Sequence, residues 1–234
     1  MAWVEHAYAN GEALADALAD ALHDACREAL AARGQATLAL AGGRTPLPAY
    51  RRLAAMPLDW SRVRVMPTDE RCVPHDHPAC NVTELRQAFA DARGVAIESL
   101  TVEDGDPLRS ELHARTMLSR HADDFDAVVL GMGLDAHTAS LFPGAAQLPM
   151  AMDPANLEGA CRIDPDPLPP EAPFSRITLT LPRLLRTRAL HLALIGQAKR
   201  DVLRLAQSSS DFARHPIAAV LHAPGATVHV HWSP

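Results

Sequence analysis

The chain has 234 residues, of which 48% are hydrophobic, and it carries a formal net charge of −6. This length and hydrophobic content fit a single α/β domain with a sizeable core, which we expect to span residues 1–234. The acidic charge argues against nucleic acid as the main partner, and the lack of a long apolar run or a secretion signal predicts a cytoplasmic protein without a membrane partner.

Helices and strands alternate from the start of the chain. Asn10 is a good helix cap, the leucines after it recur at helical spacing, and Gly34 ends the pattern. The apolar segment 37–41 predicts a short strand. The glycine turn after it leads into a second helix, with Thr45 as the N-cap and Pro46 as the first helical residue.

The alternation continues through the rest of the chain. Asn81 and Glu84 resemble a capping box that opens a helix. Segment 147–173 is proline-rich and has no helical period, so we expect a long surface connection there. Threonines alternate with apolar residues over 177–181, which predicts a half-exposed strand, and the last strand, 228–232, is expected at a sheet edge. The other predicted elements are strands at 63–66, 97–102, 127–130, 160–163 and 190–195, and helices at 81–92, at 106–121 and around Lys199.

This order of elements predicts the fold class. Strands that alternate with helices form an open, mostly parallel twisted sheet of the Rossmann-like α/β class, with helices on both faces. Right-handed crossovers place the carboxyl ends of such strands on one rim, where ligands bind. We therefore expect the loops that follow the strands to meet there.

Two of these loops predict a phosphate site. Backbone amides in the turn Gly42-Gly43-Arg44-Thr45 can cradle an anion at a helix start, although such turns are also common without a ligand. Lys199, the only lysine of the chain, falls in the first turn of a later helix. Its compact ammonium group could bind an anion, or the side chain could lie on a solvated helix face without a function.

A second loop and a strand start add further charged groups. Asp69, Glu70 and Arg71 follow a buried strand, where three charges in a row are often only a solvated turn. On the rim, Arg71 could bind an oxyanion through its guanidinium and Asp69 could orient water or a sugar hydroxyl. Arg176, just ahead of a strand, is another candidate partner for an anion.

The loop after the strand at 127–130 holds the main candidate for general-base catalysis. Gly131 and Gly133 allow a tight turn, and Asp135 and His137 stand at its far end. A capping or packed histidine is the structural alternative. The run from Gly131 to Ala136 also matches a dinucleotide fingerprint, which we set aside because no long helix follows it.

The cysteines predict neither a disulfide framework nor a metal centre. Four cysteines are too few for a disulfide scaffold in a chain of this length, so we expect reduced thiols. Cys72, His75, His77 and Cys80 form the pattern C-x2-H-x-H-x2-C, but structural zinc sites separate two ligand pairs by a longer loop. We expect a solvated loop here and no bound metal.

Several segments together resemble the 6-phosphogluconolactonase family, which is related to the glucosamine-6-phosphate deaminases. In family order they are LALAGGRTPLPAYRRLA (38–54), TDERCVPHDHPACN (68–81), DAVVLGMGLDAHTASLFPG (126–144), RITLTLP (176–182) and GQAK (196–199). The second and third of these segments are specific to the lactonase branch, since the deaminase branch instead resembles DEY and GHIAFNEP.

The resemblance implies hydrolysis of 6-phospho-D-glucono-1,5-lactone in the oxidative pentose phosphate pathway, with a sugar phosphate as the only partner and no cofactor. His137 would act as general base, Asp135 would orient the imidazole or the lactone, and Arg71 would stabilise the developing oxyanion. The phosphate would be held by Gly42, Gly43, Arg44, Thr45 and Lys199. The oligomeric state, monomer or homodimer, stays open.

Two residues depart from the family pattern, and two other functions are conceivable. Ala136 stands where the family has glycine and adds strain if the position needs a positive φ; Cys80 stands where the family often has serine. An isomerase or deaminase acting on a hexosamine phosphate is one alternative. A sugar-phosphate sensor on the same fold is the other, although the chain has no DNA-binding segment.

Overall fold

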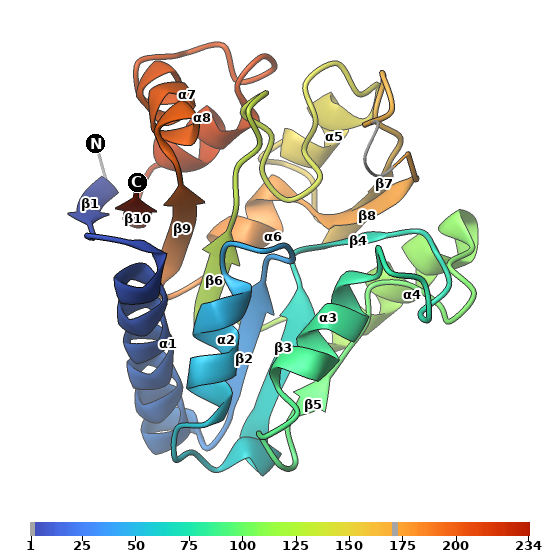
Figure 1. The fold of residues 1–234 in the computed structure, drawn as a ribbon. Helices are drawn as coiled ribbons and strands as arrows, with labels where there is room; N and C mark the ends of the chain where they lie inside the picture. Colours follow the sequence, from blue (N-terminus) through green and yellow to red (C-terminus); the bar gives the residue numbers. More distant parts are fainter. Residues whose placement is uncertain (1–2, 170–172) are drawn as a thin grey trace.

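The fold, taken from a computed structural model, is described for residues 3–169 and 173–234. A sheet of seven strands, all parallel, forms its centre (Figure 1). The strands in spatial order are β1 (Trp3–Ala7), β10 (Val228–Ser233), β9 (Leu190–Ile195), β6 (Ala127–Leu130), β2 (Ala36–Leu40), β3 (Val63–Pro67) and β5 (Ala96–Ile97). The predicted class, an open parallel sheet, is confirmed.

Helices cover both faces of this sheet, as predicted. One face is covered by α1 (Gly11–Arg33), α2 (Leu47–Ala54) and α3 (Asn81–Ala88). The core on the opposite face contains the buried residues of α4 (Pro107–Arg120), α5 (Leu148–Met152), α6 (Leu181–Leu185), α7 (Gln197–Gln207) and α8 (Pro216–Leu221). The short strand β6 shows why both faces need cover. Ala127 and Val129 pack into the α1–α3 core, whereas Val128 and Leu130 pack into the opposite core, so every residue of β6 is buried.

Helix α1 begins and ends where the sequence indicates. The Asn10 side chain accepts a hydrogen bond from the backbone N–H of Ala13 at 2.9 Å. Gly34 adopts φ 75° and donates its N–H to the Leu30 carbonyl, which closes the helix. Asp106 caps α4 in the same way, through the N–H of Arg109.

Two other predicted caps are wrong. Helix α2 begins at Leu47, and neither Thr45 nor Pro46 caps it through a side chain. Helix α3 has no capping box, because the Asn81 amide and the Glu84 carboxylate both bond to other segments of the chain. Strand β5 is also only two residues long, shorter than the predicted 97–102.

A second, antiparallel sheet lies beside the central one and was not predicted. Its strands are β4 (Asp69–Arg71), β8 (Arg176–Leu179) and β7 (Ala160–Ile163), in the order β4-β8-β7. The prediction that β8 is half-exposed is wrong, because all four of its residues are buried. Thr178 and Thr180 tolerate this burial because their hydroxyls form hydrogen bonds with backbone groups.

The two ends of the chain pair with each other at one side of the central sheet. Strand β10 lies between β1 and β9, so its predicted edge position is wrong, and β1 is the edge strand. In segment 147–173, the predicted strand at 160–163 is confirmed, but a short helix, α5, also forms there; residues 170–172 lie outside the described part. No helix within the described residues has the length and apolarity to cross a bilayer.

Histidines of β1, β10 and β9 form a cluster beside the α1–α3 core. His191 Nδ1 lies 3.0 Å from His231 Nε2, Tyr8 bonds His231 at 2.9 Å, and His6 bonds His229 at 3.2 Å. Burial, followed by the neighbouring histidines, lowers the pKa of His191 to about 3 and that of His231 to about 4. Both rings are therefore neutral in the folded protein at neutral pH.

This histidine cluster should make the free energy of unfolding fall as the pH is lowered. Unfolded histidine titrates near 6.5, whereas His191 and His231 take protons only near pH 3 and 4 when folded. The unfolded chain therefore binds more protons below pH 6.5, and the free energy of unfolding should decrease from there down to about pH 4. Urea unfolding across this range should show a shallower slope for His191→Leu. The matched control His113→Leu, at an exposed position, should keep the wild-type slope; equal slopes in both variants would contradict the assignment.

Candidate active site

Four loops meet at the carboxyl ends of β9, β6, β2 and β3, which are consecutive neighbours in the sheet. They enclose a pocket of about 230 Å³. Its lining residues are Ala41, Gly42, Asp69, Arg71, Asn81, Gly131, Met132, Gly133, His137, Ala139 and Lys199. Five of the residues predicted from sequence line it: Gly42, Asp69, Arg71, His137 and Lys199. The other five, Gly43, Arg44, Thr45, Asp135 and Arg176, lie outside the lining.

The imidazole of His137 is held by Asp135. Its Nδ1 lies 2.6 Å from Asp135 Oδ1, and its backbone N–H donates to the same oxygen at 3.2 Å. Because an ionised carboxylate only accepts, Nδ1 donates in this bond, and in the neutral form of the ring Nε2 carries the lone pair. Burial raises the pKa of Asp135, but the hydrogen bond and charge of His137 outweigh it, so the net pKa lies below its usual value.

The turn before His137 has little room for other residues. A Cβ atom on Gly133 would overlap the His137 ring and the Asp135 carboxylate, so glycine is required there for this pair to form. Ala136 adopts φ 66° and is fully buried. The left-handed conformation costs an L-residue about 1 kcal/mol, so the sequence-based concern about alanine at this position is confirmed. The buried Phe142 ring packs against the imidazole, with centroids 4.2 Å apart.

Strand β4 brings Asp69 and Arg71 to the pocket. The Asp69 carboxylate accepts a 2.5 Å hydrogen bond from the Ser140 hydroxyl, which connects β4 to the His137 loop. Arg71 Nη1 donates to the Ala79 carbonyl at 2.7 Å, so the guanidinium is held in place. Ser140 itself is 1% exposed, which removes it from contact with a ligand.

Arg176 lies behind the pocket. It is the partner of Arg71 across the β4–β8 pair, is 3% exposed, and has its guanidinium 5.9 Å from the Phe142 ring centroid. Burial lowers the pKa of Arg176 to about 10, with Asp69 acting in the opposite direction. Because Arg176 is buried and does not line the pocket, its contact with an anion stays a prediction.

The predicted phosphate end of the pocket contains Gly42 and Lys199. Lys199 is part-buried in α7; burial and the neighbouring charge of Arg44 lower its pKa. Arg44 itself is exposed and does not line the pocket. The Gly43 N–H, expected to face a phosphate, instead donates to Glu84 at 3.3 Å.

Asn81 was missed as a site residue by the sequence analysis, which treated it as a helix cap. It is 2% exposed, and its Nδ2 donates to the Asp69 carbonyl at 2.7 Å, which fixes the orientation of the amide. Its Oδ1 has no hydrogen-bond partner among the described residues and lies against Gly42, where a Cβ would overlap it. A buried acceptor that lines a pocket and lacks a donor favours a ligand hydroxyl.

Glu70 organises this side of the pocket from beneath. Its fully buried carboxylate accepts from the backbone N–H groups of Arg71, Asn81 and Val82 at 2.7, 2.8 and 2.6 Å. Glu70, which belongs to strand β4, therefore caps the start of helix α3. Burial raises the pKa of Glu70 to about 7, against the lowering effect of these N–H groups. Glu70 does not line the pocket.

The residues of the C-x2-H-x-H-x2-C pattern bond to separate partners. His75 Nε2 lies 3.1 Å from the Thr101 hydroxyl, His77 Nδ1 accepts the Ala79 N–H, and Cys80 Sγ contacts Glu70. Within residues 3–169 and 173–234, no group of three or more His, Cys, Asp or Glu side chains is arranged to hold a metal ion.

Replacing Glu70 by glutamine should destabilise the protein and weaken the site. Glutamine keeps the shape but turns one oxygen into a donor that faces backbone N–H groups. The backbone N–H group that loses its acceptor is left buried without a partner, which should cost about 2 kcal/mol in the free energy of unfolding. Urea denaturation measures this, with the exposed Glu28→Gln as control. A Glu70→Gln protein as stable as the control would contradict the capping role.

Comparison with known proteins shows the family to which the chain belongs. The sequence model described as glucosamine-6-phosphate isomerases/6-phosphogluconolactonase matches residues 9–232. A 6-phosphogluconolactonase of Rhizobium meliloti is 36% identical over 98% of both chains, and one of Pseudomonas aeruginosa is 38% identical over 89% of this chain and 85% of its own. The crystal structure of a 6-phosphogluconolactonase from Shewanella baltica, 34% identical, superposes with a TM-score of 0.92 and covers 99% of this chain and 97% of its own. The chain belongs to the glucosamine-6-phosphate isomerase/6-phosphogluconolactonase family.

Proposed function

We propose that this protein is a 6-phosphogluconolactonase, which hydrolyses 6-phospho-D-glucono-1,5-lactone to 6-phosphogluconate in the oxidative pentose phosphate pathway. Near-full-length relatives that carry this name support the reaction. The observation that carries the mechanism is the Asp135–His137 pair beside a pocket that also holds Arg71 and Lys199.

His137 acts on water. Its Nε2 lone pair takes a proton from a water molecule as the oxygen attacks the lactone carbonyl. The C–O bond of the ring then breaks, and the ring oxygen leaves with the proton from the imidazolium. Asp135 keeps the ring in the required tautomer and stabilises the transient positive charge, as the 2.6 Å bond to Nδ1 allows. No covalent enzyme intermediate is needed, because a lactone is already an activated ester.

Arg71, Asp69 and Asn81 surround the reacting sugar ring. Arg71 stabilises the negative charge that develops on the carbonyl oxygen, with its guanidinium held by the Ala79 carbonyl. Asp69, with one oxygen bonded to Ser140, orients water or a sugar hydroxyl. Asn81 Oδ1 accepts from another hydroxyl of the substrate.

The phosphate binds at the other end of the pocket. Lys199 and Arg44 supply positive charge, and the turn with Gly42, Gly43 and Thr45 supplies backbone and side-chain donors. Because Glu84 accepts from the Gly43 N–H, binding through that amide requires the carboxylate to move aside. Holding the phosphate positions the carbonyl beside His137, and such positioning can contribute several kcal/mol to catalysis.

Substitution of His137 by alanine should lower kcat by about 10² or more, with little change in KM, because general-base catalysis is lost while binding groups remain. The measurement is acid release from freshly made phosphogluconolactone, with the spontaneous rate subtracted. Asp135→Asn should show a smaller loss. Wild-type turnover by His137→Ala would remove this residue from the mechanism.

Ammonia release from glucosamine 6-phosphate by the wild-type protein would instead favour the isomerase branch.

Substitution of Lys199 by alanine should lower kcat/KM for the phosphorylated lactone by about tenfold or more, because a charged hydrogen bond to phosphate is lost. Hydrolysis of unphosphorylated gluconolactone should change little. Arg200→Ala is the matched control, because Arg200 is the next residue of α7 but stacks on the Trp232 ring at 4.0 Å. Equal losses on both substrates would contradict a phosphate-binding role.

A further inference from the structure

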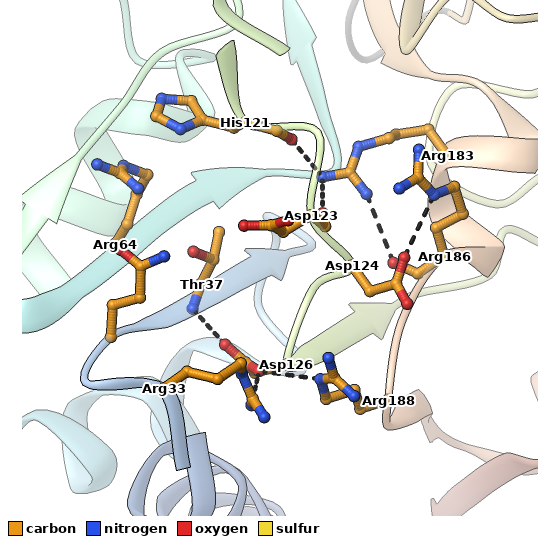
Figure 2. Close-up of a pocket in the computed structure, with 11 residues that line it drawn as sticks. Arg33, Thr37, Arg64, His121, Asp123, Asp124, Asp126, Arg183, Arg186 and Arg188 are labelled. Atoms are coloured by element: carbon orange, nitrogen blue, oxygen red, sulfur yellow. Dashed lines mark hydrogen bonds and ion pairs between the residues drawn. The ribbon is translucent and has the colours of Figure 1, made fainter. Parts of the chain in front are cut away.

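A second pocket, of about 270 Å³, lies at the opposite end of the central sheet from the candidate active site. Figure 2 shows the side chains that line it. Thr37, Arg64 and Asp126 stand at the amino-terminal starts of β2, β3 and β6, whereas the active-site loops follow the carboxyl ends of the same strands. The lining residues that carry the argument below are Asp123, Asp124, Asp126, Arg183, Arg186 and Arg188.

The lining is polar throughout and has an excess of positive charge. It contains five arginines and three aspartates, in a chain whose formal net charge is −6. One of these arginines, Arg64, forms an ion pair with Glu98 at 2.8 Å, so five arginines stand against four carboxylates. Binding sites for drug-sized organic ligands are lined mainly by apolar side chains. A pocket without any apolar lining residue suits a small hydrophilic ion, and the surplus of arginine favours an anion.

Most of the carboxylates already have partners. Asp126 accepts from the Thr37 N–H at 2.8 Å and forms ion pairs with Arg33 at 2.5 Å and Arg188 at 3.6 Å. Asp124 pairs with Arg186 at 3.3 Å. Figure 2 shows these pairs as dashed lines.

Arg183 differs from the other arginines. It is 5% exposed, and no described carboxylate lies within 4.0 Å of its guanidinium. It donates to the His121, Asp123 and Arg186 carbonyls, and it stacks 3.6 Å from the Phe125 ring centroid, but its Nε has no hydrogen-bond partner among the described residues. Carbonyl oxygens satisfy N–H groups without neutralising the charge.

The electrostatics of Arg183 reflect this lack of a counter-ion. Burial lowers its pKa to about 10, and the charge of Arg186 acts in the same direction, although Asp124 and Asp123 act in the opposite one. A buried cation without an ion-pair partner is unfavourable, and a bound anion would offset that cost.

We propose that this arginine pocket binds a small phosphate-bearing anion. Guanidinium groups match phosphate oxygens in geometry and bind them through paired hydrogen bonds. The volume admits a group of the size of pyrophosphate, and the lack of apolar lining disfavours a ligand that must bury a nucleobase or a lipid chain. The site is independent of the lactone pocket and of the activity proposed for it.

The test is calorimetric titration with inorganic pyrophosphate in a Lys199→Ala background, which weakens phosphate binding at the candidate active site. Arg186→Gln/Arg188→Gln removes two exposed arginines of the pocket. The matched control, Arg27→Gln/Arg204→Gln, removes two exposed, ion-paired arginines elsewhere and makes the same change in net charge. Arg64→Gln is a second pocket variant, should the double variant fail to fold. Sodium sulfate at equal ionic strength measures nonspecific salt effects.

The expected result is one saturable site with a Kd below about 1 mM, weakened about tenfold or more in the pocket variants and unchanged in the control. Equal affinity in the pocket and control variants would overturn the proposal. So would the absence of saturable binding in the Lys199→Ala background, or equal binding of sulfate that the pocket substitutions leave unchanged.

Discussion

The parallel direction of the seven central strands is the constraint on which the rest of the structure depends. Because every strand runs the same way, each crossover returns the chain to the amino-terminal end of the sheet. The loop that follows each strand therefore lies at the carboxyl end. Strands β9, β6, β2 and β3 are consecutive neighbours, so their carboxyl-end loops converge even though Gly42 and Lys199 are far apart in sequence. The chain turns to opposite sides at the β2–β6 pair, and this is where parallel sheets open a crevice for ligands.

The antiparallel sheet completes the site on one side. Strand β4 extends past the end of β3 and carries Asp69 and Arg71 over the pocket, and β8 lies behind it. The carboxylate of Glu70 joins β4 to the start of α3 through three backbone N–H groups, so Arg71 and Asn81 are positioned by a single buried group. Short, charge-assisted hydrogen bonds of this kind fix geometry better than packing alone, which suits a site that must hold a small substrate in one orientation.

Charged groups gather at both ends of the central sheet, but in different chemical surroundings. At the carboxyl end, one imidazole, one ammonium and one guanidinium face a pocket with little competing negative charge beyond Asp69. At the amino end, arginines and aspartates largely pair with each other, and Arg183 is buried without a carboxylate partner. Strand β6 connects the two regions, since Asp126 precedes it and the glycine turn with His137 follows it.

The amino-acid sequence by itself determined the fold class and most element positions, because hydrophobic period, caps and turn residues are local signals. Asn10, Gly34 and Asp106 mark their helices correctly, and Asp135 and His137 lie two residues apart, so their hydrogen bond depends on a turn that local sequence can indicate. Tertiary structure alone decided which strands are edges, that β8 is buried, that Glu84 bonds to Gly43, and that Glu70 caps α3. It also placed Arg176 behind the pocket and Asn81 within it. These outcomes depend on partners distant in the sequence, and no local pattern specifies which backbone group a buried hydroxyl, amide or carboxylate will find.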